Sequence, residues 1–349
     1  MNTTFSERAV ALQNEYLLKT EALFVTNRTT WLADFGKHFQ EVCSALQTLQ
    51  DKAVIPTISY LEYVMLYTNF IDRRYVAEVF VYNNKSYNDK TQHQICELDI
   101  SFLFTHFDEF WNKLFAERNR YANRVTAREI RSIMLTALPY YYSYLANIAR
   151  FAIANCIDVS PFADIAKNDV FRVNVGDYMA KTENVYTEKK KKDTKALAEW
   201  FQERLMNKYT FDDYSGLDFS GCSFPLTDFR YSQFRNSCLK NTSFNGCALI
   251  GTNFHKANLD NCCFKNSSIN EADFSNATLK NASFLNAYGR AGLPNSEKWL
   301  QAGYLPVNFR NADLTNVNFT GANLSGADFT GAELVGADFT DAILDGAVF

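Results

Sequence analysis

In the C-terminal part of the chain, a large apolar residue returns at every fifth position. The repeat keeps its register from Phe219 to Phe349, with one interruption after Phe284. An α-helix has about 3.6 residues per turn, and a β-strand places alternate side chains on one face, so neither explains a period of five. The chain must therefore turn a corner in every repeat, as a solenoid does.

The other positions of each repeat fit a narrow interior. Two residues before each large residue lies a small one, such as Cys222, Ala272 or Ala327. Small and large side chains must alternate if both fill the inside of a thin coil. Two residues after the large one, most positions hold Gly or Asn, the residues that most readily accept a positive φ angle at a corner.

The stretch GANLSGADFTGAELVGADFT at 321–340 resembles the pentapeptide-repeat family, whose consensus is A(D/N)LxX. The resemblance covers about two fifths of the chain. It implies a right-handed, quadrilateral β-helix with four pentapeptides per coil. Such a solenoid is stabilised by stacking of neighbouring coils, and its ends need caps.

The interruption AYGRAGLPNSEKWLQAGYLPV at 287–307 separates two alternating series of Phe and Leu or Ile. Phe284 and Phe309 are five repeats apart, an odd number, so Phe would change face if every repeat wound into the helix. We therefore predict that about 5 or about 15 residues leave as a loop near 289–299, which keeps Phe stacked on Phe.

The remaining residues predict a separate, mainly helical α+β domain, so the expected domains are 1–208 and 209–349, with an insertion loop near 287–306. The apolar patterns predict helices at 6–24 and 30–50, followed by strands at 58–68 and 75–82 that form an antiparallel pair. Next come a helix capped by Asp99 and a helix that begins at the capping box of Thr126 and Glu129 and runs to about 156. A further strand pair at 170–175 and 178–186 and a helix at 193–207 complete the domain. The last helix leads directly into the first coil, so we expect its apolar face to cover the N-terminal end of the solenoid.

Motifs for catalysis and for cofactor binding are missing from the sequence. There is no GxSxG, HExxH, P-loop or GxGxxG, and the four histidines have no ligand spacing. The adjacent Cys262 and Cys263 lack a second pair at zinc-like spacing, which favours a structural role. We therefore predict a protein that is not an enzyme, with no catalytic residues, no cofactor and no metal.

The chain begins without a secretory signal, which predicts a cytoplasmic protein. The apolar stretch 133–157 contains Arg150 and Asn147, so we expect a buried helix there and not a membrane span. The run Lys189–Lys192 is flanked by acids. It is typical of a solvated helix start, and we expect no direct nucleic-acid or membrane contact from it.

The last coils are acidic. Between Leu305 and Phe349 six acids face a single base, Arg310, which gives a net charge of −5 over about 11 Å at ~4.8 Å per coil. Duplex DNA of that length carries about 6 charges. Asp313 and Glu333 are twenty residues apart and should stack on one face, whereas the other acids fall on different faces. Ordinary solubilising charge is the alternative interpretation. These six acids are named here the acidic collar; they are Asp313, Asp328, Glu333, Asp338, Asp341 and Asp345.

The resemblance implies two functional hypotheses. Some pentapeptide-repeat proteins mimic DNA and bind a type II topoisomerase (DNA gyrase or topoisomerase IV), which protects against quinolones or gyrase-directed toxins. In the alternative, the protein is an adaptor or scaffold whose N-terminal domain binds a protein partner and whose solenoid is a rigid spacer. We also expect a homodimer through the C-terminal coils, because Leu344 and Phe349 would otherwise face water.

Overall fold

The computed structural model describes residues 4–83, 92–121, 124–157, 160–178, 181–189, 193–203 and 208–349. The chain forms two compact units. The first comprises Met1–Tyr186 and Pro294–Ala302, and the second comprises Thr187–Leu293 and Gly303–Phe349. The chain therefore passes from one unit to the other three times.

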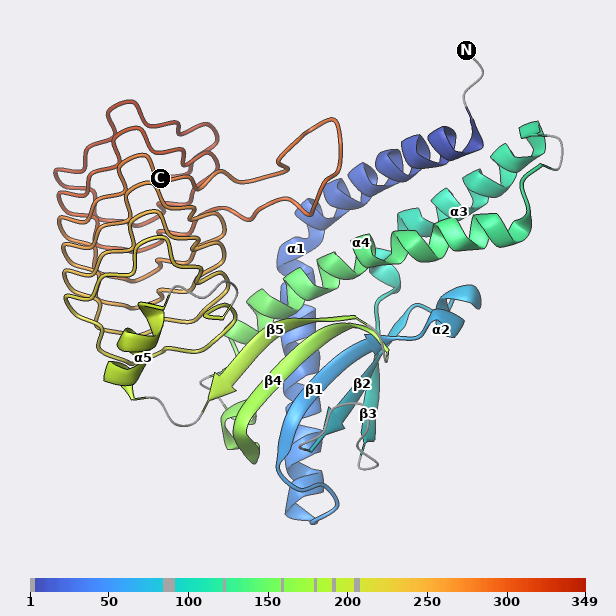
Figure 1. Ribbon diagram of the computed structural model, residues 1–349, viewed down its shortest axis with the longest axis horizontal. Coiled ribbons are helices and arrows are strands. Elements are labelled where there is room, and N and C mark those ends of the chain that lie inside the picture. Colours follow the sequence, from blue (N-terminus) through green and yellow to red (C-terminus); the bar gives the residue numbers. More distant parts are fainter. Residues whose placement is uncertain are drawn as a thin grey trace. The chain divides into compact units, whose positions relative to one another are not determined.

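The first unit combines helices with a five-stranded mixed sheet, and thus has an α+β fold (Figure 1). Its elements are α1 (Phe5–Asp51), β1 (Ile58–Met65), α2 (Tyr67–Ile71), β2 (Val76–Tyr82), β3 (His93–Asp99), α3 (Thr105–Arg118), α4 (Ala127–Ala154), β4 (Lys167–Asp177) and β5 (Thr182–Lys189), with 3₁₀ turns at Ser101–Leu103, Asn119–Tyr121 and Phe162–Asp164. The last three residues of β5 belong to the second unit.

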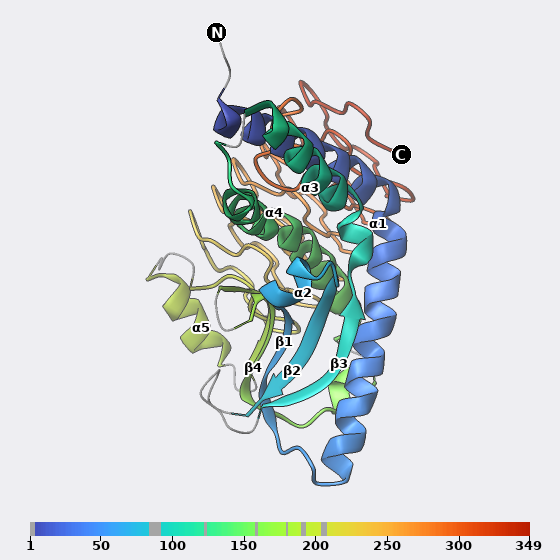
Figure 2. The ribbon, with the colours of Figure 1, turned by 90° about the vertical axis from the view of Figure 1, so that its right-hand side faces the viewer.

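The strand order in the sheet is β3-β2-β1-β4-β5. The expected antiparallel pairing of β1 with β2 is confirmed, and β1 is parallel to β4. Helix α1 runs along one face of the sheet (Figure 2), where Phe35 of α1 packs on Tyr63 of β1 with ring centroids 5.0 Å apart. The capping box of Thr126 and Glu129 is present at the start of α4, as predicted.

Helix α1 corrects one expectation, because it is a single helix of 47 residues and not two shorter helices. The gap between the two predicted helices falls at 25–29, VTNRT. In the structure Thr26 Oγ1 donates to the carbonyl of Ala22, and Asn27 Nδ2 donates to the carbonyl of Leu23. Polar side chains that bond back to the preceding turn can remain inside a helix.

Strand β3 was not predicted. Its sequence HQICELD has polar residues at most positions, and its side chains are exposed or only partly buried, as expected for a strand at the edge of a sheet. The predicted cap at Asp99 is wrong, because Asp99 ends this strand and accepts the N–H of Ser101 over 2.8 Å before a 3₁₀ turn whose N-cap is Ile100. Helix α3 starts only at Thr105 and has no side-chain cap. None of the helices in the described ranges combines the length and apolar character that a membrane span requires.

The second unit contains a β-helix solenoid. Parallel bridges join residues that are twenty positions apart, such as Asp218 with Cys238 and Asn253 with Asp273, so four five-residue repeats make one coil. Every corner position from Gly216 to Asn286 and from Asn311 to Gly346 has a positive φ angle, which confirms the role predicted for Gly and Asn. Non-Gly residues at these corners include Leu226 and Glu271.

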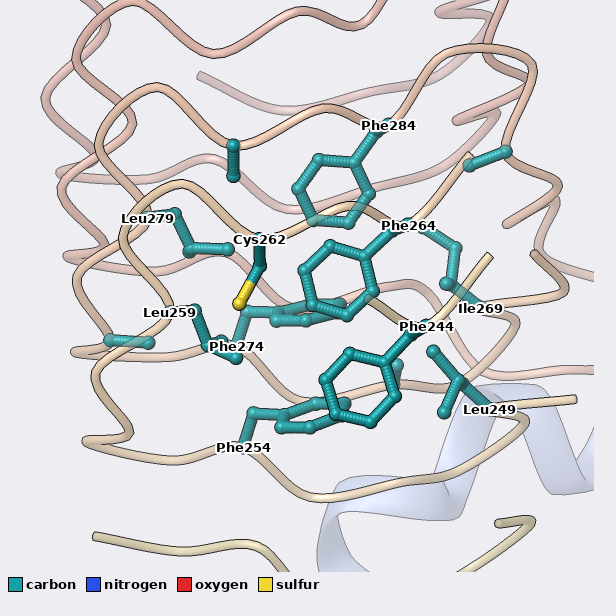
Figure 3. Close-up of a cluster of buried hydrophobic side chains, with 14 of the residues drawn as sticks. Phe244, Leu249, Phe254, Leu259, Cys262, Phe264, Ile269, Phe274, Leu279 and Phe284 are labelled. Carbon is teal, nitrogen blue, oxygen red and sulfur yellow. The ribbon is translucent and has the colours of Figure 1, made fainter. Parts of the chain in front are cut away.

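The large residues stack in columns inside the solenoid. Figure 3 shows one column, Phe244, Phe264 and Phe284, in which successive rings lie 5.3 and 4.6 Å apart and nearly parallel. Small inward residues of the earlier coils also bond to the backbone. Thr252 Oγ1 and Ser267 Oγ, for example, each donate to a carbonyl 23 residues earlier.

The interruption leaves the solenoid as an excursion, and the columns continue across it. The β-bridge between Asp273 and Asn308 joins residues 35 positions apart, whereas bridges between coils away from the interruption join residues 20 positions apart. The excursion therefore contains 15 residues more than a regular coil. This is the longer of the two predicted lengths. Phe274 stacks on Phe309 at 5.1 Å, and Phe284 stacks on Phe319 at 5.1 Å. An antiparallel bridge between Gly292 and Tyr304 closes the base of the excursion.

Helix α5 (Thr194–Phe201) covers the first coils within the second unit, as the sequence predicted. Phe201 is 1% exposed, and its ring centroid lies 5.0–5.6 Å from five other aromatic rings, those of Tyr209, Tyr214, Phe219, Phe224 and Phe229. In the predicted lysine run, Lys189 pairs with Asp212. Residues 190–192 and 204–207, which the predicted run and helix included, lie outside the described residues.

Candidate protein-binding surface of the solenoid

The residue before each large one has a local structural role. Where this residue is Asp or Asn, its side-chain oxygen accepts the backbone N–H two residues later, as in Asp218 with Ser220 (2.9 Å) and Asn318 with Thr320 (2.8 Å). This side-chain-to-backbone bond holds the turn that leads to the next corner. The Asp or Asn of the repeat is therefore explained by the fold before any partner is considered.

Three residues of the acidic collar occupy this turn position. Asp313, Asp328 and Asp338 accept the N–H groups of Thr315 (3.2 Å), Thr330 (2.9 Å) and Thr340 (2.9 Å). Hydrogen bonds from the Thr340 side chain and backbone lower the pKa of Asp338. Partial burial acts to raise the pKa of Asp313, but hydrogen bonds from Thr315 and Lys280 outweigh it and lower the pKa.

Two collar residues are also paired with bases. Lys280 Nζ lies 3.1 Å from Asp313 Oδ2, and Arg310 Nη1 lies 3.0 Å from Asp328 Oδ2. Lys280 stands on the coil before the excursion, so counting charges between Leu305 and Phe349 missed it. Among the residues that the structure describes, the other four members of the collar make no ion pair.

The structure brings only two collar residues onto one ladder. Asp313 and Glu333 form a bridge on neighbouring coils, as predicted. Asp328 and Asp338 lie on two other ladders, opposite Asn308 and Asn318. Asp341 is a corner residue with φ +57°, and Asp345 follows a large residue. Glu333, Asp338, Asp341 and Asp345 are exposed, so the unpaired acids form a ring on the final coils and not a stripe.

The two residues predicted for a dimer interface differ in exposure. Leu344 is partly buried, whereas Phe349 is 60% exposed although its ring stacks on Phe329 at 5.0 Å. Val335 and Val348, also on these coils, are 65% and 53% exposed. The final described coils therefore present an apolar edge beside the unpaired acids.

The structure also locates the histidines and cysteines considered for chemistry. Cys262 points inward and donates to the carbonyl of Leu239 over 2.8 Å, whereas its neighbour Cys263 occupies an outward ladder position. His255 Nδ1 lies 2.8 Å from Ser275 Oγ on the next coil. Within the described ranges, no three His, Cys, Asp or Glu side chains are grouped as a metal site would require.

Sequence reasoning missed two properties of this surface. The turn role of Asp313, Asp328 and Asp338 could have been predicted from the sequence. The consensus allows Asp and Asn equally, and Asn carries no charge, so this position requires a side-chain oxygen and not a charge. The pairing of Lys280 with Asp313 depends on the length of the excursion, since Lys280 and Asp313 are 33 residues apart in the sequence but on adjacent coils. The Phe and Leu pattern is compatible with either about 5 or about 15 extra residues.

Family models identify pentapeptide repeats at residues 215–246 and 308–348 and a pentapeptide repeat region at 237–291. No curated protein matches the chain. Similar solved structures include a pentapeptide repeat protein from the thylakoid lumen of Arabidopsis thaliana, with 22% identity, a TM-score of 0.27 and coverage of 32% of this chain and 67% of that one. Rfr23 from the cyanobacterium Cyanothece 51142 has 20% identity, a TM-score of 0.24 and coverage of 43% and 98%.

A third similar structure is QnrB1, described as a plasmid-mediated fluoroquinolone resistance protein, with 19% identity, a TM-score of 0.25 and coverage of 40% of this chain and 66% of that one. The five-residue period, the twenty-residue ladders and the family matches agree with one another. Residues 215–291 and 308–348 of this chain are pentapeptide repeats.

Proposed function

We propose that the chain is a non-enzymatic protein-binding protein whose solenoid, a right-handed quadrilateral β-helix, presents its acidic collar to a basic surface of a partner. The observation that supports this function is a ring of exposed acids that make no ion pair with any residue in the described part of the chain, namely Glu333, Asp338, Asp341 and Asp345. A surface of one sign favours encounter with a partner of the opposite sign.

The proposed partner is a type II topoisomerase, DNA gyrase or topoisomerase IV, in the cytoplasm. Such an enzyme binds duplex DNA, which carries one charge per ~1.7 Å. The collar with Arg310 carries −5 over about 11 Å, and about −4 when Lys280 is included. We propose that the collar mimics DNA and that the protein thereby protects against quinolones or gyrase toxins.

A charge-neutralising variant tests this function without disturbing the turns. Glu333→Gln, Asp341→Asn and Asp345→Asn remove three charges, and within the described ranges none of these side chains makes a turn bond. The matched control, Asp213→Asn, Asp218→Asn and Asp260→Asn, removes three charges from earlier coils and keeps each side-chain acceptor. In a gyrase supercoiling assay, the effect of the first variant on supercoiling should be at least about tenfold weaker than that of the wild type. The control variant should act as the wild type does. Equal effects of the two variants, or no effect of the wild type, would contradict DNA mimicry.

The adaptor function is the second candidate, and the first unit favours it. That unit has its own buried core around β1 and α4, and it takes up residues 294–302 from between the repeats. In this case the solenoid is a spacer. A partner whose chemical crosslinks map to residues 4–186, and whose binding survives collar neutralisation, would favour the adaptor.

We also propose that two copies associate through the final coils, with Leu344 and Phe349 at the interface. The exposed Phe349 ring and the exposed Val335 and Val348 support this proposal. Two apposed collars would double the length of the acidic surface, so association would strengthen the resemblance to DNA.

A further inference from the structure

The tip of the excursion, Pro294–Ala302, belongs to the first unit, where Trp299 is only 6% exposed. Its indole Nε1 donates to Tyr144 Oη over 2.7 Å, and Tyr144 Oη in turn donates to Glu21 Oε2 over 2.7 Å. The ring of Tyr140 meets the indole edge-on with centroids 5.0 Å apart. Helix α4 supplies the two tyrosines and α1 supplies Glu21, so two helices form a site around one side chain.

Asn14 of α1 binds the backbone of the tip at two points. Its Oδ1 accepts the N–H of Trp299 over 2.8 Å, and its Nδ2 donates to the carbonyl of Glu297 over 3.1 Å. One amide that both donates to and accepts from a backbone recognises the shape of a turn. The contacts of the indole with Tyr140 and Tyr144 then add selectivity for the side chain that follows the turn.

The excursion holds its form at its base and within its tip. Gly292 and Tyr304 exchange backbone hydrogen bonds of 2.8 and 3.1 Å, and Glu271 Oε1 accepts the N–H of Leu305 over 3.0 Å. Within the tip, Asn295 Oδ1 accepts the N–H groups of Glu297 and Lys298 at 2.9 and 3.1 Å. A segment that is already ordered loses little conformational freedom when it binds.

We propose that Asn14, Glu21, Tyr140 and Tyr144 form a peptide-recognition site, and that the tip of the excursion occupies it in cis as a releasable latch. The ligand class is a short turn that offers a backbone N–H and C=O to Asn14 and a tryptophan to Tyr144. The latch does not depend on what the solenoid binds.

A peptide added in trans tests the site. The probe is a fluorescent peptide of residues 292–304, cyclised through its ends to reproduce the closed base, and the receptor is the full chain with Trp299→Ala. Fluorescence anisotropy should show saturable binding. Affinity should be at least about tenfold lower for the wild type, whose site is filled, and for the variant that also carries Asn14→Ala. A peptide with Ala at the position of Trp299 is the matched control.

Absence of binding to the Trp299→Ala chain, with an unchanged circular dichroism spectrum, would overturn the proposal, and so would equal binding to all three receptors. If Trp299→Ala does not fold, amide hydrogen exchange on the Asn14→Ala chain decides. The latch requires exchange across 294–302 to rise at least about tenfold while exchange across 308–330 stays unchanged. Unchanged exchange across the tip would overturn it.

Discussion

At the scale of single residues, the Asp or Asn before each large residue determines which substitutions the solenoid tolerates. Asn323 Oδ1 accepts the N–H of Ser325 over 3.2 Å and the hydroxyl of Ser325 over 2.9 Å. Asn323→Ala should lower the free energy of unfolding by about 0.5–2 kcal/mol, the range measured for comparable helix caps, because the turn loses its acceptor. Asn323→Asp should leave stability nearly unchanged, and guanidinium denaturation measures both.

Glu333→Ala is the control for this prediction. Glu333 occupies the same position in its repeat, but its longer side chain makes no turn bond among the described residues. Its loss should therefore leave the unfolding midpoint unchanged. A destabilisation as large as that of Asn323→Ala would contradict the turn argument.

A buried carboxylate in the first unit predicts a pH dependence. Asp177 is 7% exposed, and Tyr67 Oη donates to its Oδ2 over 3.0 Å. Burial raises the pKa of Asp177 above its ordinary value of 3.8, although the hydrogen bond from Tyr67 acts in the opposite direction. Because the folded-state pKa is raised, folding stability is full below 3.8 and falls as the pH rises through the folded-state value.

Asp177→Asn should therefore be more stable than the wild type at pH 7, and the difference should shrink as the pH approaches 3.8. Urea unfolding of both proteins between pH 4 and 8 measures this difference, with roughly one measurement per pH unit. A constant difference over that interval would mean that Asp177 has the same pKa in the folded and unfolded states.

At the scale of elements, α5 stabilises the solenoid through one side chain. Phe201 touches five aromatic rings of the first coils, so Phe201→Ala should leave a cavity and cost about 3–5 kcal/mol of unfolding free energy. Glu199→Ala, on the exposed side of the same helix, should change stability little. If the two variants unfold at the same denaturant concentration, α5 is not a cap.

How far elements could be predicted depended on how local their signals are. Each coil shows the five-residue period within its own sequence, so more than a hundred residues of the solenoid were predictable from Phe219 onward. The edge strand β3 was not, because its partner β2 fixes it through backbone pairing and only one of its faces is apolar. The continuity of α1 depends on the hydrogen bonds of Thr26 and Asn27 to the preceding turn, and these bonds cannot be predicted from the sequence.

At the scale of the whole molecule, the oligomeric state is the most direct prediction. Light scattering at micromolar concentration should give about 80 kDa, twice the chain mass of 39.9 kDa. Phe349→Asp should reduce this to the mass of one chain, because it places a charge on the apolar edge of the final coils. Leu226→Asp, at another exposed apolar position of the solenoid, is the control and should not change the mass. A wild-type mass of about 40 kDa would contradict the proposed interface.

Much of the candidate surface was visible in the sequence as charge, but its division into turn-forming and unpaired acids was not. That division follows from two local facts, the reach of an Asp side chain and the position of Lys280 one coil away from Asp313. The docking of Trp299 could not be predicted from the sequence for another reason. Its partners Asn14 and Tyr144 lie 155 or more residues earlier, and no periodic pattern links them to the interruption.

The unbroken stacking of Phe274 on Phe309 and of Phe284 on Phe319 makes the excursion a natural place to divide the gene. A chain cut beside the exposed Leu300 keeps the hydrogen-bonded base and both aromatic columns. Its two products, residues 1–300 and 301–349, would carry matching end faces and could be made separately. They would then serve as a split reporter in which the aromatic columns become continuous only when the two halves meet.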